Sequence, residues 1–239
     1  MTQNFTTLQI PPPALALVDR VRRIASRARR AIGISYNRTE ALLFDLRHGT
    51  DTRGKTAAAN MGLTGEGALH ATGYQAVNEA HLSSVLRAHD FPAGSTFVDI
   101  GSGKGKALLL ASRHKPISRV VGIEISAPLS AIAERNVTAF ERAHGRAADI
   151  RVVAADAIEA PIEPDQNIIF LNNPFDEAFL KLFLDKLDKS LSEHPRRLWL
   201  LYANPQARRL LTDVFHYSLI KEHAFFGPGR NIAVYAKGA

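Results

Sequence analysis

The chain has 239 residues, of which 46% are hydrophobic and 22% are charged, as in a globular protein of one domain or one domain with an extension. These proportions exclude collagen, a coiled coil and wholesale disorder. No apolar run approaches the roughly 18 residues that cross a bilayer. With no cysteine, disulfides and thiolate sites are excluded. We therefore expect a cytoplasmic protein with no membrane span.

Positive charge is concentrated near the start of the chain. The formal net charge is +7, and residues 1–31 hold six arginines against the single acid Asp19. The rest of the chain is therefore close to neutral, which is not typical of a dedicated nucleic-acid binder.

Residues 14–32 are predicted to form a basic amphipathic helix after an extended start at residues 10–13. Apolar residues recur there at steps of three and four and leave the arginines on the other faces. Three interpretations stay open: a helix that packs on the main domain with solvated arginines, a surface-binding or partner-binding helix, or a transit peptide.

Two further segments precede the main domain, which we place at residues 91–239, after an N-terminal extension of residues 1–90. Residues 47–72 are rich in glycine, threonine and small polar types and are predicted to form loops with short helical pieces. Residues 76–89 have an apolar face typical of a helix.

From residue 94 onward, short β-branched runs alternate with helical stretches, which predicts an α/β fold around a mostly parallel sheet. The predicted strands are residues 96–100, 119–124, 150–154, 168–171, 198–202, 217–224 and 231–236. The predicted helices are residues 106–113, 128–143, 177–192 and 205–215. The last two strands are separated by a link too short for a crossover helix, so they are expected to form an antiparallel hairpin.

A glycine-rich loop follows the first of these strands, with Val-Asp-Ile-Gly-Ser-Gly-Lys-Gly-Lys at residues 98–106. Glycines let the backbone approach a ligand, and the helix that follows offers unpaired N–H groups. The P-loop template fails because Ile100 stands where it requires glycine and Ala107 replaces its Ser or Thr. The dinucleotide fingerprint fits poorly because Lys106 takes the place of its last small residue.

What remains is an acid followed by alternate glycines, Asp99, Gly101, Gly103 and Gly105. This pattern resembles the first motif of class I S-adenosylmethionine (SAM) dependent methyltransferases, and the resemblance covers residues 94–236. It implies a Rossmann-like, seven-stranded sheet with helices on both faces and SAM as the cofactor. It also implies that the loop carries the methionine and ribose part of SAM. Ser102 and Lys106 belong to the same group of candidates, and a tight turn without ligand is the alternative.

Two carboxylates follow in the order that the resemblance implies. Glu124 ends the second strand, where its carboxylate can accept both ribose hydroxyls. Asp156 follows the third strand, where an acid in this family meets the adenine amino group and its neighbour, here Ala157, packs against the ring. A helix cap is the alternative for Asp156, and Ser126 is more readily a cap than a cofactor contact.

The fourth strand runs into a polar turn, Asn172-Asn173-Pro174-Phe175. It resembles the Asn/Asp-Pro-Pro-aromatic motif of amino-group methyltransferases, with Asn173 in place of the first proline. It is more similar to an Asn-Asn-aromatic turn in the histone lysine methyltransferase branch. We predict that Asn172 orients an acceptor amine and also contacts the cofactor, and that Phe175 forms a wall that excludes water. An ordinary turn is the alternative.

Residues 44–52, with Gly73 and Tyr74, resemble the segment that caps the cofactor and shapes the acceptor pocket in a bacterial group of these enzymes. Thr50, Asp51 and Tyr74 are therefore further cofactor candidates. His48 is interpreted as a loop histidine rather than a base, and Asn204 as a helix cap or a crevice residue. No spacing of histidines predicts a metal site.

The sequence thus predicts a SAM-dependent methyltransferase whose acceptor is an amine nitrogen, with a protein lysine favoured over a small amine. A small-molecule O- or N-methyltransferase is the enzymatic alternative. A non-catalytic basic adaptor that uses residues 14–32 on nucleic acid or an anionic membrane is the alternative from another class.

Overall fold

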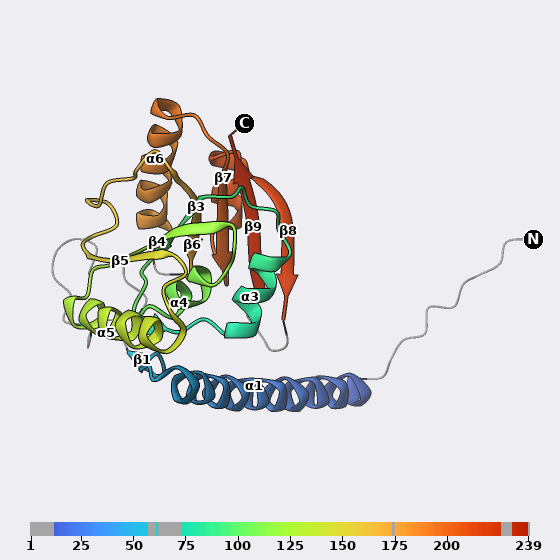
Figure 1. Ribbon diagram of the computed structural model, residues 1–239. Coiled ribbons are helices and arrows are strands. Elements are labelled where there is room, and N and C mark those ends of the chain that lie inside the picture. Colours follow the sequence, from blue (N-terminus) through green and yellow to red (C-terminus); the bar gives the residue numbers. More distant parts are fainter. Residues whose placement is uncertain (1–11, 57–60, 62–72, 174, 226–230, 239) are drawn as a thin grey trace, which may run out of the picture.

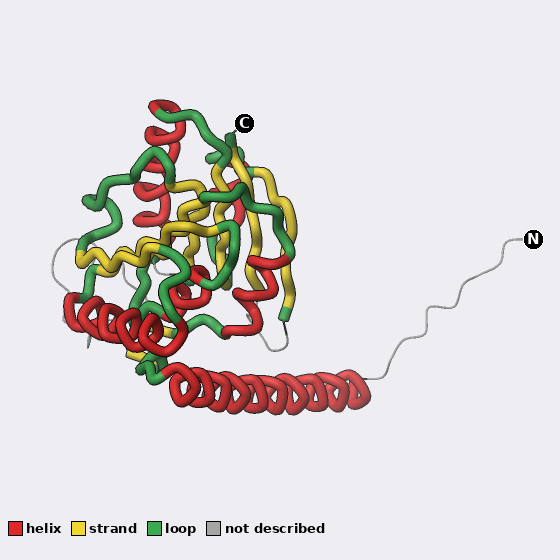
Figure 2. Tube along the Cα trace, in the orientation of Figure 1, coloured by secondary structure: helices red, strands yellow, loops and turns green. Residues whose placement is uncertain are grey.

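The structure is a computed structural model that describes residues 12–56, 61, 73–173, 175–225 and 231–238. A seven-stranded sheet lies at its centre (Figures 1 and 2). Its strands are β3 (Ser95–Ile100), β4 (Ile117–Glu124), β5 (Asp149–Ala154), β6 (Gln166–Leu171), β7 (Leu198–Ala203), β8 (Ser218–Ala224) and β9 (Asn231–Lys237). All seven predicted strands are confirmed, with ends shifted by two residues at most.

The strand order is β5-β4-β3-β6-β7-β9-β8, and within this sheet only β9 runs opposite to the other strands. This confirms the mostly parallel, Rossmann-like sheet and the C-terminal antiparallel hairpin. The chain passes from β3 to β4 on one side and returns to β6 on the other. The carboxyl ends of β3 and β6 therefore border the crevice at which such sheets bind ligands.

Helices cover both faces, as predicted. One face carries α3 (Glu79–Arg87), α4 (Lys106–Ser112) and α5 (Ala127–His144), and the other carries α6 (Glu177–Glu193). Neighbouring residues of one strand enter opposite core clusters: Val98 packs on the α6 side and Phe97 on the α3 and α4 side. Strands buried on both faces explain the nearly continuous apolar runs of the sequence. Although it precedes residue 91, α3 packs in the second of these clusters through Leu82, Val85 and Leu86.

The helix predicted over residues 205–215 is shorter, and its main part is the π-helical turn η2 (Leu210–Val214). Asn204, with φ 52°, turns the chain out of the helical conformation, and Pro205 supplies no N–H donor. A hydrogen bond from Phe215 N to Leu210 O, five residues back, gives the turn its wide geometry.

The first helix is longer than predicted: α1 (Pro12–His48) continues well beyond residue 32. It also begins inside the segment 10–13 that was predicted to be extended, because proline is tolerated in the first turn of a helix. Gly33 disfavours a helix by only about 1 kcal/mol relative to alanine. The added turns bury Phe44, which is 1% exposed, and the free energy gained by this packing outweighs the cost of glycine in the helix. Figure 1 shows α1 extending past the sheet, and every described residue from 20 to 28 is exposed.

The segment predicted as loops with short helical pieces also differs. After α1 it continues as a loop to β1 (Lys55–Thr56), which pairs antiparallel with β2 (Tyr74–Gln75). Nothing in the apolar pattern indicates this two-residue ladder. Residues 57–60 and 62–72 lie outside the described part of the chain. No helix of the described part is long and apolar enough to cross a membrane.

Candidate active site

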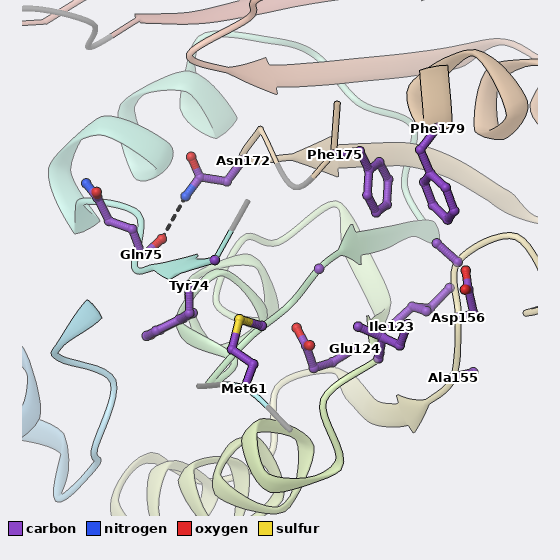
Figure 3. Close-up of a pocket in the computed structure, with 14 residues that line it drawn as sticks. Met61, Tyr74, Gln75, Ile123, Glu124, Ala155, Asp156, Asn172, Phe175 and Phe179 are labelled. Atoms are coloured by element: carbon purple, nitrogen blue, oxygen red, sulfur yellow. Dashed lines mark hydrogen bonds between the residues drawn. The ribbon is translucent and has the colours of Figure 1, made fainter. Parts of the chain in front are cut away.

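A pocket lies at the carboxyl ends of β3 to β6, where the loops after these four strands face β2 (Figure 3). It is lined by Met61, Gly73, Tyr74, Gln75, Gly101, Ile123, Glu124, Ile125, Ala155, Asp156, Ala157, Asn172, Phe175 and Phe179. Seven of the residues predicted from the sequence are in this set: Tyr74, Gly101, Glu124, Asp156, Ala157, Asn172 and Phe175. The topology therefore brings together residues that are more than 100 positions apart in the chain.

Glu124 is the buried carboxylate of this pocket, with 2% of the residue exposed. Its Oε2 accepts a hydrogen bond from Gly103 N at 2.7 Å, and its Oε1 accepts one from Ser126 N at 2.8 Å. Burial raises the pKa of Glu124, and backbone N–H groups of Ser126, Gly103 and Ile125 oppose that change. A carboxylate has about four acceptor positions, so Glu124 can still accept a hydroxyl group.

Asp99 and Ser102 form the floor of a smaller neighbouring cavity, which Gly101 and Lys106 also line. Burial, followed by the charge of Glu124, holds the pKa of Asp99 well above its usual range. The buried Oγ of Ser102 has no hydrogen-bond partner in the described part of the chain. The Ser102 hydroxyl packs toward Gly122 of β4, so the buried carboxyl group of Asp99 is the feature here that fits a ligand bringing a cation.

The alternate glycines have different surroundings. Gly101 lines the pocket, whereas Gly103 is covered by the Tyr74 ring. Gly105 begins α4 with φ 84°, and a Cβ atom there would lie 3.1 Å from Ala133 Cβ of α5. Gly105 therefore allows close packing of helices and does not line the cavity.

Lys106 is turned away from the main pocket. Its Nζ donates to Glu40 Oε1 at 2.6 Å and lies 4.5 Å from the centre of the Phe44 ring. The Lys106 side chain is 1% exposed, so this ion pair fastens the second half of α1 to the helix after the glycine loop.

The segment that caps the glycine loop is built around Asp45, the last acidic residue of α1. Its carboxylate accepts hydrogen bonds from Thr50 Oγ1, from both N and Oγ1 of Thr52, and from Arg53 N, at 2.8 to 3.0 Å. Tyr74 Oη then donates to Thr52 O at 2.5 Å. Thr50 thus supports this segment from within and does not line the pocket.

Asn136 joins the same segment to the glycine loop. Its Oδ1 accepts from Asp51 N at 2.7 Å, and its Nδ2 donates to Asp51 O and to Lys104 O. The Asp51 carboxylate faces outward and pairs with Lys104 Nζ at 3.0 Å. Sequence reasoning did not single out Asn136, but a signal was present: it continues the apolar spacing of Leu129 and Ala133 on the buried face of α5.

Asp156 lines the pocket on the far side from Tyr74. Its Oδ1 accepts from Ile158 N at 2.9 Å, so it also closes the turn that follows β5. Lys186 of α6 holds this turn from behind, because its Nζ donates to the carbonyl oxygens of Ala157, Ile158 and Ala160. Lys186 is a second residue that sequence reasoning missed, since its distance from Asp156 in the chain conceals the contact.

Asn172 lies between the cofactor pocket and a second, wider groove. Its Nδ2 donates to Gln75 O at 2.9 Å (Figure 3), and its Oδ1 accepts from Asn204 Nδ2 at 3.4 Å. Asn204 lines the groove and does not cap a helix. Its buried Oδ1 has no hydrogen-bond partner in the described part of the chain. Phe175 packs against Phe179 with ring centres 4.6 Å apart and closes the pocket on one side.

The groove is lined by Ile34, Asn37, Lys55, Gln75, Ala76, Val77, Asn78, His81, Asn172, Ala203, Asn204, Phe225, Asn231 and Ile232. None of these residues is acidic. His48, interpreted from the sequence as a loop residue, is instead the last residue of α1, and its Nδ1 lies 2.6 Å from His144 Nε2, away from both cavities. Ser126 caps α5, as predicted. The described residues contain no group of three potential metal ligands.

The fold and the pocket define a class I SAM-dependent methyltransferase, whose cofactor is SAM. The family model described as histone methylation protein DOT1 matches residues 68–191, which are 124 of the 239 residues. The chain belongs to this family. None of the curated proteins compared with the chain matches it significantly.

Two solved structures with a TM-score of 0.50 share the fold, and a third is similar over a comparable length. The B. subtilis M1A22 tRNA methyltransferase TrmK is 22% identical with a TM-score of 0.50, and the match covers 66% of this chain and 65% of that one. A protein of the NADB-Rossmann superfamily from Streptococcus agalactiae is 17% identical with a TM-score of 0.50 and 70% coverage of both chains. An RNA methyltransferase from Salinibacter ruber, in complex with S-adenosyl-L-homocysteine, is 18% identical with a TM-score of 0.46, covering 69% of this chain and 93% of that one.

Proposed function

We propose that the chain methylates an amine nitrogen, with the side chain of a protein lysine as the favoured acceptor. The observation that carries this proposal is the position of Asn172, whose amide lies where the cofactor pocket meets the groove. The description of the matching family as a histone methylation protein supports a protein acceptor.

SAM, when bound, would supply an electrophilic methyl group on a sulfonium; the lone pair of the acceptor would form the new bond to carbon, and the electrons of the broken C–S bond would remain on sulfur. In this proposal Glu124 would hold the ribose hydroxyls, Asp156 the adenine end, and Asp99 the amino group. Phe175 and Phe179 exclude water from one side of the pocket.

The groove favours the neutral form of an amine, which is the only form with a lone pair to donate. No acidic residue is present among the described residues that line it, so an ammonium group finds no ion-pair partner there. Lys55 lines the same groove, and a nearby positive charge lowers the pKa of an amine. The side-chain oxygens of Asn172 and Asn204 can accept the amine N–H groups and thereby aim the lone pair at the methyl carbon. No strong general base is needed for this arrangement.

The test incubates purified protein and methyl-labelled SAM with an extract of host cells that lack the gene. The label is then followed through protease, nuclease and size fractionation, with a Glu124→Ala variant as the blank. We expect protease-sensitive label that acid hydrolysis releases as methylated lysine. Label confined to small molecules or to nuclease-sensitive material would contradict the proposed acceptor, while label on a base-labile ester would contradict nitrogen as the acceptor atom.

A further inference from the structure

The two halves of α1 differ in what they contact. The second half is held to the body by Phe44, which is buried, and by the Glu40–Lys106 ion pair. The first half extends beyond the sheet, as Figures 1 and 2 show, and its described residues from 20 to 28 are exposed.

A stripe of exposed apolar side chains runs along nearly the whole of α1. The stripe consists of Val21, Ile24, Ile32, Tyr36, Leu43 and Leu46, with exposed fractions of 56%, 58%, 58%, 48%, 52% and 72%. At about 100° per residue, these positions fall within an arc of roughly 120° on the helix. Phe44 and Asp45, which are buried against the body, lie outside this arc. The stripe is therefore a second apolar face, exposed in the part of the chain that the structure describes.

Positive charge flanks the stripe. Residues 20–39 contain seven arginines and no aspartate or glutamate. Among these arginines, Arg20, Arg22, Arg23, Arg27 and Arg38 are exposed. Arg20 and Arg22 fall on the two sides of the stripe, where long side chains can reach a surface that the stripe enters.

We propose that α1 lies in the plane of an anionic lipid surface, with this stripe among the acyl chains and the arginines at the phosphate groups. Such a surface satisfies both features, because basic helices with an apolar face bind bilayers through buried apolar area and attraction to anionic lipid. A nucleic-acid backbone matches the arginines and gives the stripe no partner. A second copy of the helix would cover the stripe and bring like charges together.

The orientation leaves the active site accessible. Ile34 and Asn37, which line the acceptor groove, fall on the side of α1 away from the stripe. A docked protein would thus keep its groove on the side of α1 that faces away from the lipid, open to an acceptor in solution.

The test is sedimentation of the full chain with phosphatidylcholine vesicles, with and without about one third phosphatidylglycerol. The variant I24S/I32S removes two apolar residues of the stripe and keeps every arginine. The control Leu182→Ser removes an apolar side chain of α6 that is 53% exposed. Affinity for SAM, measured on all three proteins, checks that each is folded.

We expect the wild-type and Leu182→Ser proteins to bind the anionic vesicles only, and I24S/I32S to bind them at least about tenfold more weakly. Absence of vesicle binding by the wild type overturns the proposal, as does equal binding by I24S/I32S. Tighter binding to duplex DNA or RNA that I24S/I32S does not weaken would assign the helix to nucleic acid instead. A dimer that dissociates in I24S/I32S, with no vesicle binding, would assign the stripe to a second copy.

Discussion

The ring of Tyr74 lies against the backbone of Gly103 so closely that a Cβ atom at position 103 would come within 2.1 Å of Tyr74 Cδ2. Gly103 has φ 54°, a conformation that L side chains rarely adopt, and its N–H donates to Glu124. Burial raises the pKa of Tyr74, so its hydroxyl stays protonated and continues to donate to Thr52 O. The pair therefore joins the capping segment, the glycine loop and the buried carboxylate of the pocket.

Gly103→Ala is expected to lower the affinity for SAM at least about tenfold, because the new methyl group displaces the Tyr74 ring. The left-handed backbone at position 103 adds a strain of about 1–2 kcal/mol for a residue other than glycine. Gly145→Ala is the matched control, since Gly145 has φ 73° and no atom within 4 Å of its Cβ position. Calorimetric titration with SAM and urea unfolding measure both effects. An equal loss of SAM affinity in the two variants would show that Tyr74 is not involved.

Glu124→Ala should weaken SAM binding by about 1–3 kcal/mol, since charge-assisted hydrogen bonds to the cofactor are lost. Glu124→Gln should have a smaller effect, because an amide keeps one acceptor oxygen for one of the two backbone donors and a ribose hydroxyl, although its NH2 group then faces the other donor. The control Glu134→Ala removes an exposed carboxylate of α5. Equilibrium binding of SAM is the measurement, and unchanged affinity in Glu124→Ala would remove this residue from the cofactor site.

Asn172→Ala is expected to lower turnover at saturating SAM by at least about tenfold, with a much smaller change in SAM affinity, because its role is orientation of the acceptor. Asn172→Asp keeps the shape and adds a negative charge, which raises the pKa of a neighbouring amine. Its pH–rate profile should therefore shift to higher pH. A profile that stays in place would mean that the amine does not approach this side chain.

Lys186→Met should reduce SAM affinity several-fold and the free energy of unfolding by about 1–3 kcal/mol, because three carbonyl oxygens of the Asp156 turn lose their donor. Lys181→Met serves as control: its partner Asp185 is exposed, and such pairs contribute less than about 1 kcal/mol. Urea unfolding and SAM titration of both variants separate the two effects. Full SAM affinity in Lys186→Met would show that the turn holds its shape alone.

The contribution of His48 to stability should be lost as the pH is lowered from 6.5 toward 4, whereas the raised pKa values of Asp99 and Glu124 act in the opposite direction. Burial, followed by the neighbouring charge of His144, lowers the pKa of His48 from 6.5 to about 4. In this window the unfolded chain binds the proton that the folded chain excludes, so protonation favours unfolding. Burial lowers the pKa values of His89, His114 and His223 as well, in the same direction.

The test is urea unfolding as a function of pH for the wild type, His48→Gln and His194→Gln. His48→Gln should lose part of the dependence, while His194→Gln, in which an exposed side chain is replaced, should keep it. Identical slopes in all three proteins would show that the His48–His144 contact does not exclude the proton.

The local sequence was enough to predict the strands of the sheet, and the glycine loop and Glu124 of the pocket. Strands buried on both faces have continuous apolar runs, and the acid, the alternate glycines and Glu124 mark strand ends that a parallel sheet places at one edge. The link between the last two strands was too short for a crossover, which predicted the antiparallel hairpin. These features depend on residues close together in the chain, so a single sequence contains them.

Only the tertiary structure decided how distant segments close the site. The length of α1 depends on the burial of Phe44 and on the pairing of Glu40 with Lys106, 66 positions apart, which no local pattern indicates. Contacts between distant segments also place Tyr74 on Gly103, Asn136 between two loops, and Lys186 behind Asp156. A buried polar group is stable only with a partner, and the fold determines which partner comes within reach.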